Sequence, residues 1–174
     1  MKNYLQSLGQ LVKTNKGFTL VELVVVIMIL GIITAMSMPN FGRPLSDYKL
    51  YTAARQLATD IRSLEQKSIN LADDKYNNYS NYIMFGSKNK YLINEVIPST
   101  GDNVQVIQRS VNLPSGIEIF LTNFTNNMLV FNRSGGTSSG GTISLKSTVT
   151  GKQLYVIVLT GSGRVRVSNT PASE

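Results

Sequence analysis

One stretch of the sequence constrains the fold more than any other. From Phe18 to Met38 the chain has 21 residues whose only charge is Glu22. At about 1.5 Å per residue, a helix of this length spans roughly 31 Å, the thickness of the hydrocarbon core of a bilayer. We therefore expect a single membrane-spanning helix here. Because Lys13 and Lys16 precede it, the positive-inside rule predicts a cytoplasmic N-terminus and places the rest of the chain outside.

Glu22 is the unusual residue of this helix. A carboxylate in a hydrocarbon segment costs roughly 2.5–3.5 kcal/mol at the helix centre, less near an end, and such residues usually have a function. Neither a permanent anchor nor a conventional signal peptide explains it, although Ala35 and Ser37 are small residues of the kind that a signal peptidase reads. Cleavage between Gly17 and Phe18 would create a cationic amine. That amine, on a neighbouring subunit, would neutralise the carboxylate and set the axial register of an assembly.

The run from Gly17 to Glu22 resembles the type III signal sequence of type IV pilins and type II secretion pseudopilins. If Phe18 is the first mature residue, Glu22 is the fifth and Pro39 the twenty-second, positions at which that family characteristically has Glu and Pro. The resemblance implies cleavage after Gly17 by a prepilin peptidase, N-methylation of Phe18, and packing of the apolar helix into a filament core. Since proline lacks an amide hydrogen and crowds the preceding turn, we expect a helix kink at Pro39.

A second, amphipathic helix is predicted after Pro39, from about Ser46 to Ala72. Apolar or small residues recur at steps of three and four, which indicates one buried helix face: Leu50, Ala54, Leu57, Ile61, Leu64, Ser68 and Leu71. We expect this face to pack on a sheet. The opposite face is expected to be solvated or to dock a neighbouring subunit, and it carries Arg55, Asp60, Arg62, Glu65 and Lys67.

After Tyr82 the pattern changes to short apolar stretches separated by turn residues, which predicts an antiparallel sheet. The expected strands are residues 82–85, 91–97, 104–109, 117–122, 129–132, 142–146, 154–159 and 164–167. Alternation at Ile117, Ile119 and Leu121 places these three side chains on one buried face. Residues 154–159 are apolar on both faces, as expected of a central strand.

The predicted fold class is α+β, a long N-terminal helix with a transmembrane half and an amphipathic half, packed on an antiparallel sheet head as in the pilin fold. The predicted divisions are a cleaved cytoplasmic leader, a membrane or filament-core helix, an amphipathic helix that continues into the head, and a β-rich head. Their ranges are 1–17, 18–38, 39–72 and 73–174.

The C-terminal third resembles the GspH/FimT group of minor pseudopilins and minor pilins, through residues 129–135, 141–145, 154–159 and 163–167. In one branch of that group, a Gly-Arg-x-Arg segment contacts DNA, and Gly163 to Arg166 matches it. On a strand, Arg164 and Arg166 project from one face, so two guanidiniums would reach neighbouring phosphates. The alternative is that they are exposed edge-strand arginines that discourage unwanted pairing.

Composition narrows the chemistry further. The chain has no Cys and no His, so disulfides, thiol chemistry and the usual nitrogen and sulfur ligands of zinc are absent. Its formal charge is +7, which becomes +4 (7 − 3) without the three lysines of the leader. The acids Glu95, Asp102 and Glu118 lie in unrelated turns or strands, and no catalytic constellation emerges. We therefore expect no enzyme activity, no cofactor and no metal site.

Together these features predict a minor pilin or pseudopilin of a type IV pilus or a type II secretion pseudopilus. A DNA-binding minor pilin of an uptake pilus is the alternative, and a secreted soluble adhesin is a third reading. The expected partners are other pilins or pseudopilins, a prepilin peptidase, an inner-membrane assembly platform, membrane lipid and, in the alternative, DNA. The expected location is the cytoplasmic membrane as a single-pass protein, followed by a periplasmic or extracellular filament.

Overall fold

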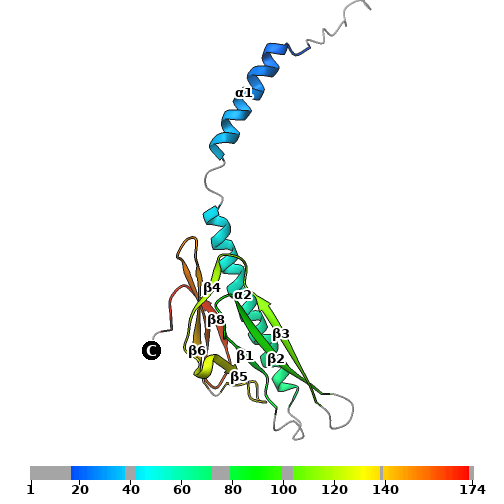
Figure 1. Cartoon of the computed structure of the whole chain (residues 1–174), viewed down its shortest axis with the longest axis vertical. Helices are drawn as coiled ribbons and strands as arrows, with labels where there is room; N and C mark the ends of the chain where they lie inside the picture. The colour runs from blue at the N-terminus through cyan, green and yellow to red at the C-terminus, as the bar shows by residue number, and fades with distance from the viewer. Residues whose placement is uncertain (1–16, 38–41, 72–78, 99–103, 138, 173–174) are drawn as a thin grey trace, which may run out of the picture. The chain divides into compact units, whose positions relative to one another are not determined.

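The computed structural model describes residues 17–37, 42–71, 79–98, 104–137 and 139–172. Its chain divides into two compact units at Asn40. The first unit contains helix α1 (Leu20–Ser37), and the second, the head, contains helix α2 (Gly42–Ile69) and all the strands (Figure 1). The predicted α+β fold, a long helical N-terminal part with a helix packed on antiparallel sheets, is confirmed. Pro39, the expected kink, lies outside the described residues.

Within the described residues, eight strands form the sheets of the head, and each predicted strand has an observed counterpart. They are β1 (Tyr82–Met84), β2 (Lys90–Pro98), β3 (Val104–Asn112), β4 (Ile117–Thr122), β5 (Met128–Val130), β6 (Gly141–Ser147), β7 (Gln153–Val158) and β8 (Val165–Ser168). The strands make two antiparallel sheets, ordered β3-β2-β1-β5 and β4-β6-β7-β8, where one sheet was expected. Strand β7 is central, as predicted from its apolar residues on both faces.

The chain crosses between the two sheets at β4, at β5 and again at β6. The crossing into β5 uses a 3₁₀ turn, Thr125–Asn127, in which Asn126 and Asn127 have left-handed φ angles of 53° and 54° that asparagine tolerates well. The crossing into β6 runs through a Gly/Ser-rich segment. There a Cβ on Gly136 would lie 2.1 Å from the carbonyl oxygen of Gly161, so this glycine is required by close backbone packing.

The core of the head lies along α2. All seven residues of the predicted stripe, from Leu50 to Leu71, are buried, and five of them, together with the neighbouring Ala53 and Ala58, pack with side chains from both sheets. Three aromatic side chains pack together within this core, one directly after β1, one on β2 and one in the β4–β5 crossing: Phe85 lies 6.3 Å from Tyr91 and 6.0 Å from Phe124 between ring centroids. The head therefore contains its own hydrophobic core.

One predicted core position in β4 is wrong. Leu121 was expected to face inward with Ile117 and Ile119, but it is 63% exposed. The register between β4 and β6 shifts between Ile119 and Leu121, which is a β-bulge at Phe120. A bulge inserts one residue into the alternation, and so turns the following side chain to the opposite face.

Candidate functional site

The start of α1 is set by a side-chain cap. Gly17, Phe18 and Thr19 are described and not helical, and the helix begins at Leu20. The backbone N–H of Glu22 donates a hydrogen bond to Oγ1 of Thr19 at 3.2 Å. Threonine at the cap with glutamate at the third helical position is the capping-box pattern, which stabilises a helix start. The Gly17–Phe18 peptide bond therefore lies outside the helix, where the Phe18 side chain is 81% exposed.

This cap gives Glu22 a local role that the sequence interpretation missed. Its carboxylate also lies in the first turn of α1, where the helix dipole favours a negative charge. The Thr-x-x-Glu spacing from Thr19 to Glu22 is the sequence pattern from which this cap could have been predicted.

The body of α1 is apolar on every side. Its large hydrophobic side chains are 41–79% exposed, from Val24 to Leu20. The hydroxyl of Thr34 donates to the carbonyl oxygen of Leu30 at 2.6 Å, so this polar group is satisfied within the helix. Across the described ranges of the chain, no helix is both long enough and apolar enough to cross a membrane. The expected membrane-spanning helix is thus not confirmed, and α1 has 18 residues where 21 were expected.

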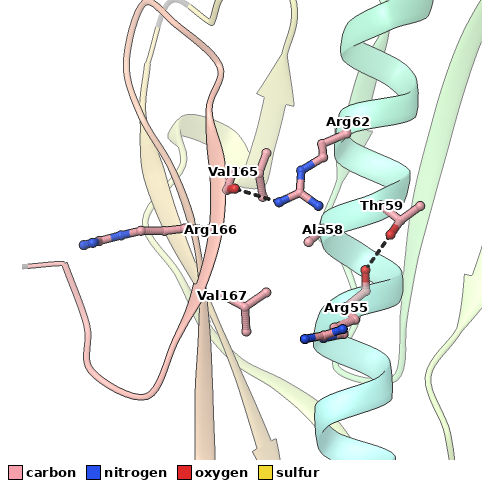
Figure 2. A pocket seen from close by; sticks show the side chains of 7 residues that line it. All are labelled: Arg55, Ala58, Thr59, Arg62, Val165, Arg166 and Val167. Atoms are coloured by element: carbon pink, nitrogen blue, oxygen red, sulfur yellow. Dashed lines mark hydrogen bonds between the residues drawn. The ribbon is translucent and has the colours of Figure 1, made fainter.

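The two C-terminal arginines lie beside and on β8. Arg164 and Arg166 are exposed, while Val165 and Val167 are half-buried against the core. In Figure 2 the Arg166 side chain points away from α2, and both valines point toward it. The alternation of the strand therefore separates two cationic side chains from two apolar ones.

Between α2 and β8 lies a groove with a volume of about 500 Å³ (Figure 2). We call it the α2–β8 groove, and its lining residues are Arg55, Ala58, Thr59, Arg62, Val165, Arg166 and Val167. Arg62 Nη2 donates a hydrogen bond to the carbonyl oxygen of Val165 at 2.9 Å. The Arg55 guanidinium lies over the Tyr51 ring, 4.5 Å from its centroid, which is a cation–π contact.

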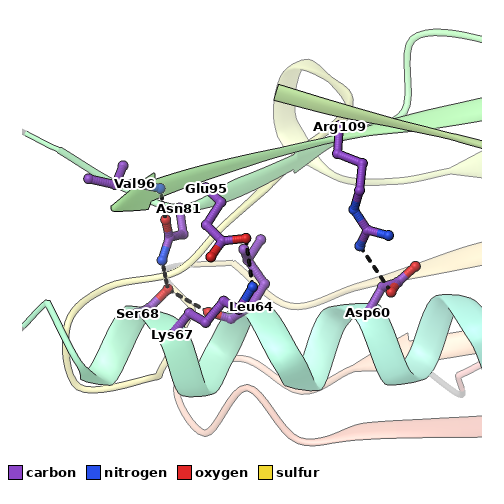
Figure 3. Close-up of polar contacts among 8 residues, drawn as sticks. All are labelled: Asp60, Leu64, Lys67, Ser68, Asn81, Glu95, Val96 and Arg109. Atoms are coloured by element: carbon purple, nitrogen blue, oxygen red, sulfur yellow. Dashed lines mark hydrogen bonds and ion pairs between the residues drawn. The ribbon is translucent and has the colours of Figure 1, made fainter. Parts of the chain in front are cut away.

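Asp60 corrects a further prediction, because it was assigned to the solvated face of the helix but is only 7% exposed. Tyr91 Oη donates to Asp60 Oδ2 at 2.5 Å, and Asp60 Oδ1 accepts from Gln56 Nε2 at 3.2 Å. Asp60 Oδ1 also accepts from Arg109 Nη2 at 3.3 Å (Figure 3). Burial, and then the hydrogen bond to Asp60, raise the pKa of the Tyr91 hydroxyl above its ordinary value, so Tyr91 remains a proton donor.

A second polar network joins α2 to the same sheet. The buried Asn81 donates through Nδ2 to Ser68 Oγ at 3.0 Å and accepts the N–H of Val96 through Oδ1 at 2.7 Å. Nearby, Lys67 Nζ lies 2.6 Å from Glu95 Oε2 (Figure 3). These contacts stabilise the packing of the helix and present no reactive group to solvent. Nothing in the local sequence of Asn81 distinguishes it from the polar loop before it.

Glu65 lies at the end of the α2–β8 groove, partly buried beside the turn that contains Gly163. Burial raises the pKa of its carboxyl, and the nearby Arg62 opposes this in part. The turn depends on glycine: Gly163 has a φ of +66°, and a Cβ there would lie 2.7 Å from the carbonyl oxygen of Gly135.

Residues 12–38 of the chain match a family model described as the prokaryotic N-terminal methylation motif. The type IV major pilin protein PilA of Myxococcus xanthus (strain DK1622) is 33% identical over 81 residues, which are 44% of this chain and 35% of the relative. The match thus spans about a third of that relative's length. No solved structure matches this chain. The matched motif contains α1, its cap and the Gly17–Phe18 bond.

Proposed function

We propose that this type IV pilin-like chain serves as a non-catalytic subunit of a type IV filament that assembles through α1. The observation that carries this proposal is the uniform apolar surface of α1. A helix that is hydrophobic on all sides is stable only when its whole circumference is buried. We propose that lipid surrounds α1 before assembly, when the subunit is in the cytoplasmic membrane, and that the helices of other pilins surround α1 in the filament.

Processing at the Gly17–Phe18 bond is the first step of the proposed pathway. A prepilin peptidase would cleave this bond, and the new amine of Phe18 would be N-methylated. The exposed, non-helical backbone before α1 supports this role, because a protease needs an extended and accessible segment. The remaining subunit would then enter the filament through an inner-membrane assembly platform, with its head in the periplasm or outside the cell.

Glu22 is proposed to set the axial position of the subunit through the amine of a neighbouring subunit. An unpaired carboxylate in a dry bundle is strongly unfavourable, and a nearby cation relieves this cost. Because Glu22 also belongs to the helix cap, the test must separate charge from capping. Glutamine can cap as glutamate does but carries no charge.

We therefore compare Glu22→Gln and Glu22→Ala with the control Glu118→Gln, which neutralises a carboxylate on β4 of the head, in cells that lack the native chain. Both Glu22 variants should insert into the membrane as the native chain does, yet enter purified filaments at roughly a tenth of its level or less. The control should enter filaments normally. Normal entry of Glu22→Gln would contradict the role of the charge and leave only the cap.

Minor status is the finer proposal, and it rests on the likeness of the C-terminal strands to the GspH/FimT group. The matched relative is named as a major pilin, so major status is the alternative. A minor pilin and a major pilin differ in the number of copies per filament. Quantitative mass spectrometry of purified filaments decides between them. A few copies of this chain per filament would support a minor pilin or pseudopilin, and a filament made mostly of it would contradict that status.

DNA capture is the second candidate function, favoured by the exposure of Arg164, directly before β8, and of Arg166 on it. Each arginine that neutralises a phosphate adds about 0.9 to the dependence of log affinity on log salt. The double variant Arg164→Gln, Arg166→Gln should therefore weaken binding to duplex DNA and lower this salt slope by about 2. The control, Lys88→Gln with Lys90→Gln, changes the net charge equally on another part of the head. An equal change in slope for both pairs would remove β8 as the DNA site.

A further inference from the structure

Strand β8 leaves one edge of the second sheet open. It is the last strand in the order β4-β6-β7-β8, and among the described residues it pairs only with β7. In an antiparallel pair, alternate residues direct both their N–H and C=O groups away from the partner strand. The carbonyl oxygen of Val165 accepts from Arg62, a side chain of α2, and this shows that Val165 faces outward. Val167 has the same parity and therefore also faces outward.

The α2–β8 groove lies along this open edge. It is continuous with two neighbouring hollows, which share Arg62 and Val165 at one end and Arg55 and Val167 at the other. The four residues of β8 extend roughly 13 Å at about 3.3 Å per residue. A short extended segment can therefore pair along the strand while α2 forms the other wall.

The charge of the groove indicates which segment would bind. Its connected hollows are lined by Arg55, Arg62 and Arg164, against the single acid Glu65, whereas the side chain of Arg166 points away from α2. The groove and its hollows therefore have a net charge of +2 (3 − 1) before any protonation of Glu65, whose pKa is raised by burial. Carboxylates on alternate residues of an extended segment would all reach one side of it, where guanidiniums bind them with charge-assisted hydrogen bonds.

We propose that the α2–β8 groove binds an extended acidic peptide segment of a partner protein, which adds as a fifth strand beside β8. Main-chain hydrogen bonds to Val165 and Val167 supply the pairing, and Arg55 and Arg62 select the carboxylates. In the unbound subunit, Arg62 occupies the carbonyl of Val165 and protects the edge against unspecific pairing. The incoming strand replaces this hydrogen bond with its own N–H and leaves Arg62 free for a carboxylate.

A nucleic acid fits these observations less well than a peptide does. Phosphates bind arginines, but a phosphodiester backbone has no N–H groups to pair with the outward carbonyls of β8. The groove also belongs entirely to the head, so its ligand can be tested whether or not α1 enters a filament.

The test uses the full chain in detergent micelles and a fluorescently labelled, blocked six-residue peptide of alternating valine and glutamate. Anisotropy titrations should show saturable binding. Two matched peptides should bind at least about tenfold more weakly: one with lysine for glutamate, and one methylated at the amide nitrogens that would pair with β8. Arg55→Gln should weaken binding by about threefold, whereas Lys88→Gln, far from the groove, should not change it.

Hydrogen exchange gives an independent readout of the pairing. The bound peptide should slow exchange of the outward Val167 amide and leave that of Arg166, which faces β7, unchanged. The proposal is overturned if the peptide does not bind, if the methylated peptide binds equally well, or if Arg55→Gln has no effect. It is also overturned if a single-stranded oligonucleotide of matched charge displaces the peptide and protects the same amide, because the groove would then be a nucleic-acid site.

Discussion

The two helices of this chain carry their apolar residues in opposite ways. Helix α2 gathers most of them in one stripe, which is buried against the strands of the head, and its other faces are mainly polar, with Leu45, Tyr48, Tyr51 and Ile69 exposed. Helix α1 has apolar residues all around, and each of its large hydrophobic side chains is more than a third exposed. Exposed apolar surface favours association roughly in proportion to its area. The apolar face of α2 is buried within the head, whereas the apolar surface of α1 must be buried by other molecules.

The difference teaches where stability and assembly are encoded. Substitutions in α2 should act on the unfolding of the head, whereas substitutions in α1 should act on insertion and filament formation. The predictions below separate these two effects.

The largest effect is expected from Leu57→Ala in the α2 stripe. Leu57 is fully buried, and removing a buried leucine side chain costs about 2–5 kcal/mol, so the free energy of unfolding of the head should fall by that amount. The matched variant Ile27→Ala in α1 should change it by less than about 0.5 kcal/mol. Denaturant titrations of the full chain in micelles, followed by near-UV circular dichroism of the tyrosines, measure both. A large effect of Ile27→Ala would mean that α1 belongs to the core of the head.

Asp60→Ala should have the next largest effect, because it leaves the buried hydroxyl of Tyr91 without its acceptor. We expect a loss of roughly 2–4 kcal/mol in the free energy of unfolding. Asp47→Ala is the control: this partly exposed carboxylate on the same helix lies 3.3 Å from Lys152, and its removal should cost less than about 1 kcal/mol. Equal losses for the two variants in the same titration would argue against a special role of the buried network.

Thr19→Ala should loosen only the first turn of α1, because its hydroxyl oxygen caps the Glu22 amide. A lost cap costs about 1 kcal/mol, so amides in this turn should exchange about fivefold faster. Thr34→Ala removes a hydroxyl near the C-terminal end of the same helix and should leave these amides unchanged. The unfolding of the head should be unaffected by both substitutions, and a lower stability of the head with Thr19→Ala would contradict the separation of the two regions.

The smallest effect concerns pH and Glu65. Because the folded state raises the pKa of this carboxyl, the unfolded chain loses the proton first as the pH rises. Folding is therefore penalised above the ordinary pKa of 4.5, and the penalty is absent below it. Glu65→Gln should stabilise the head by up to about 0.5 kcal/mol at pH 7 and by nothing at pH 4. Glu95→Gln should do the reverse at pH 7, because it removes an ion pair with Lys67. A stabilisation by Glu65→Gln that persists at low pH would exclude the titration as its cause.

Much of the head could be predicted because its signals are local. The stripe from Leu50 to Leu71 fixes the buried face of α2, and the eight apolar stretches locate the strands to within a few residues. Pairing could not be predicted, because the same alternation suits one sheet or two. Leu121 was misplaced because a bulge depends on the partner strand, and Asp60 because its donors, Tyr91 and Arg109, lie far away in the sequence.

The candidate site shows the same limit. The Thr19–Glu22 cap could have been predicted, because both residues of its pattern lie within four positions of the sequence. The α2–β8 groove depends on residues about 100 positions apart, such as Arg62 and Val165, and only the fold brings them together. The helix kink at Pro39 stays a prediction from the sequence, because Pro39 lies outside the described residues.

The most direct test of the central claim is the mass of the N-terminal peptide of the mature chain, isolated from cells that produce its filament. If α1 is a processed filament-core helix, this peptide begins at Phe18 and carries one additional methyl group on its amine. A peptide that retains the leader, or a mature chain that begins near Met38 after conventional signal-peptide removal, would contradict the account.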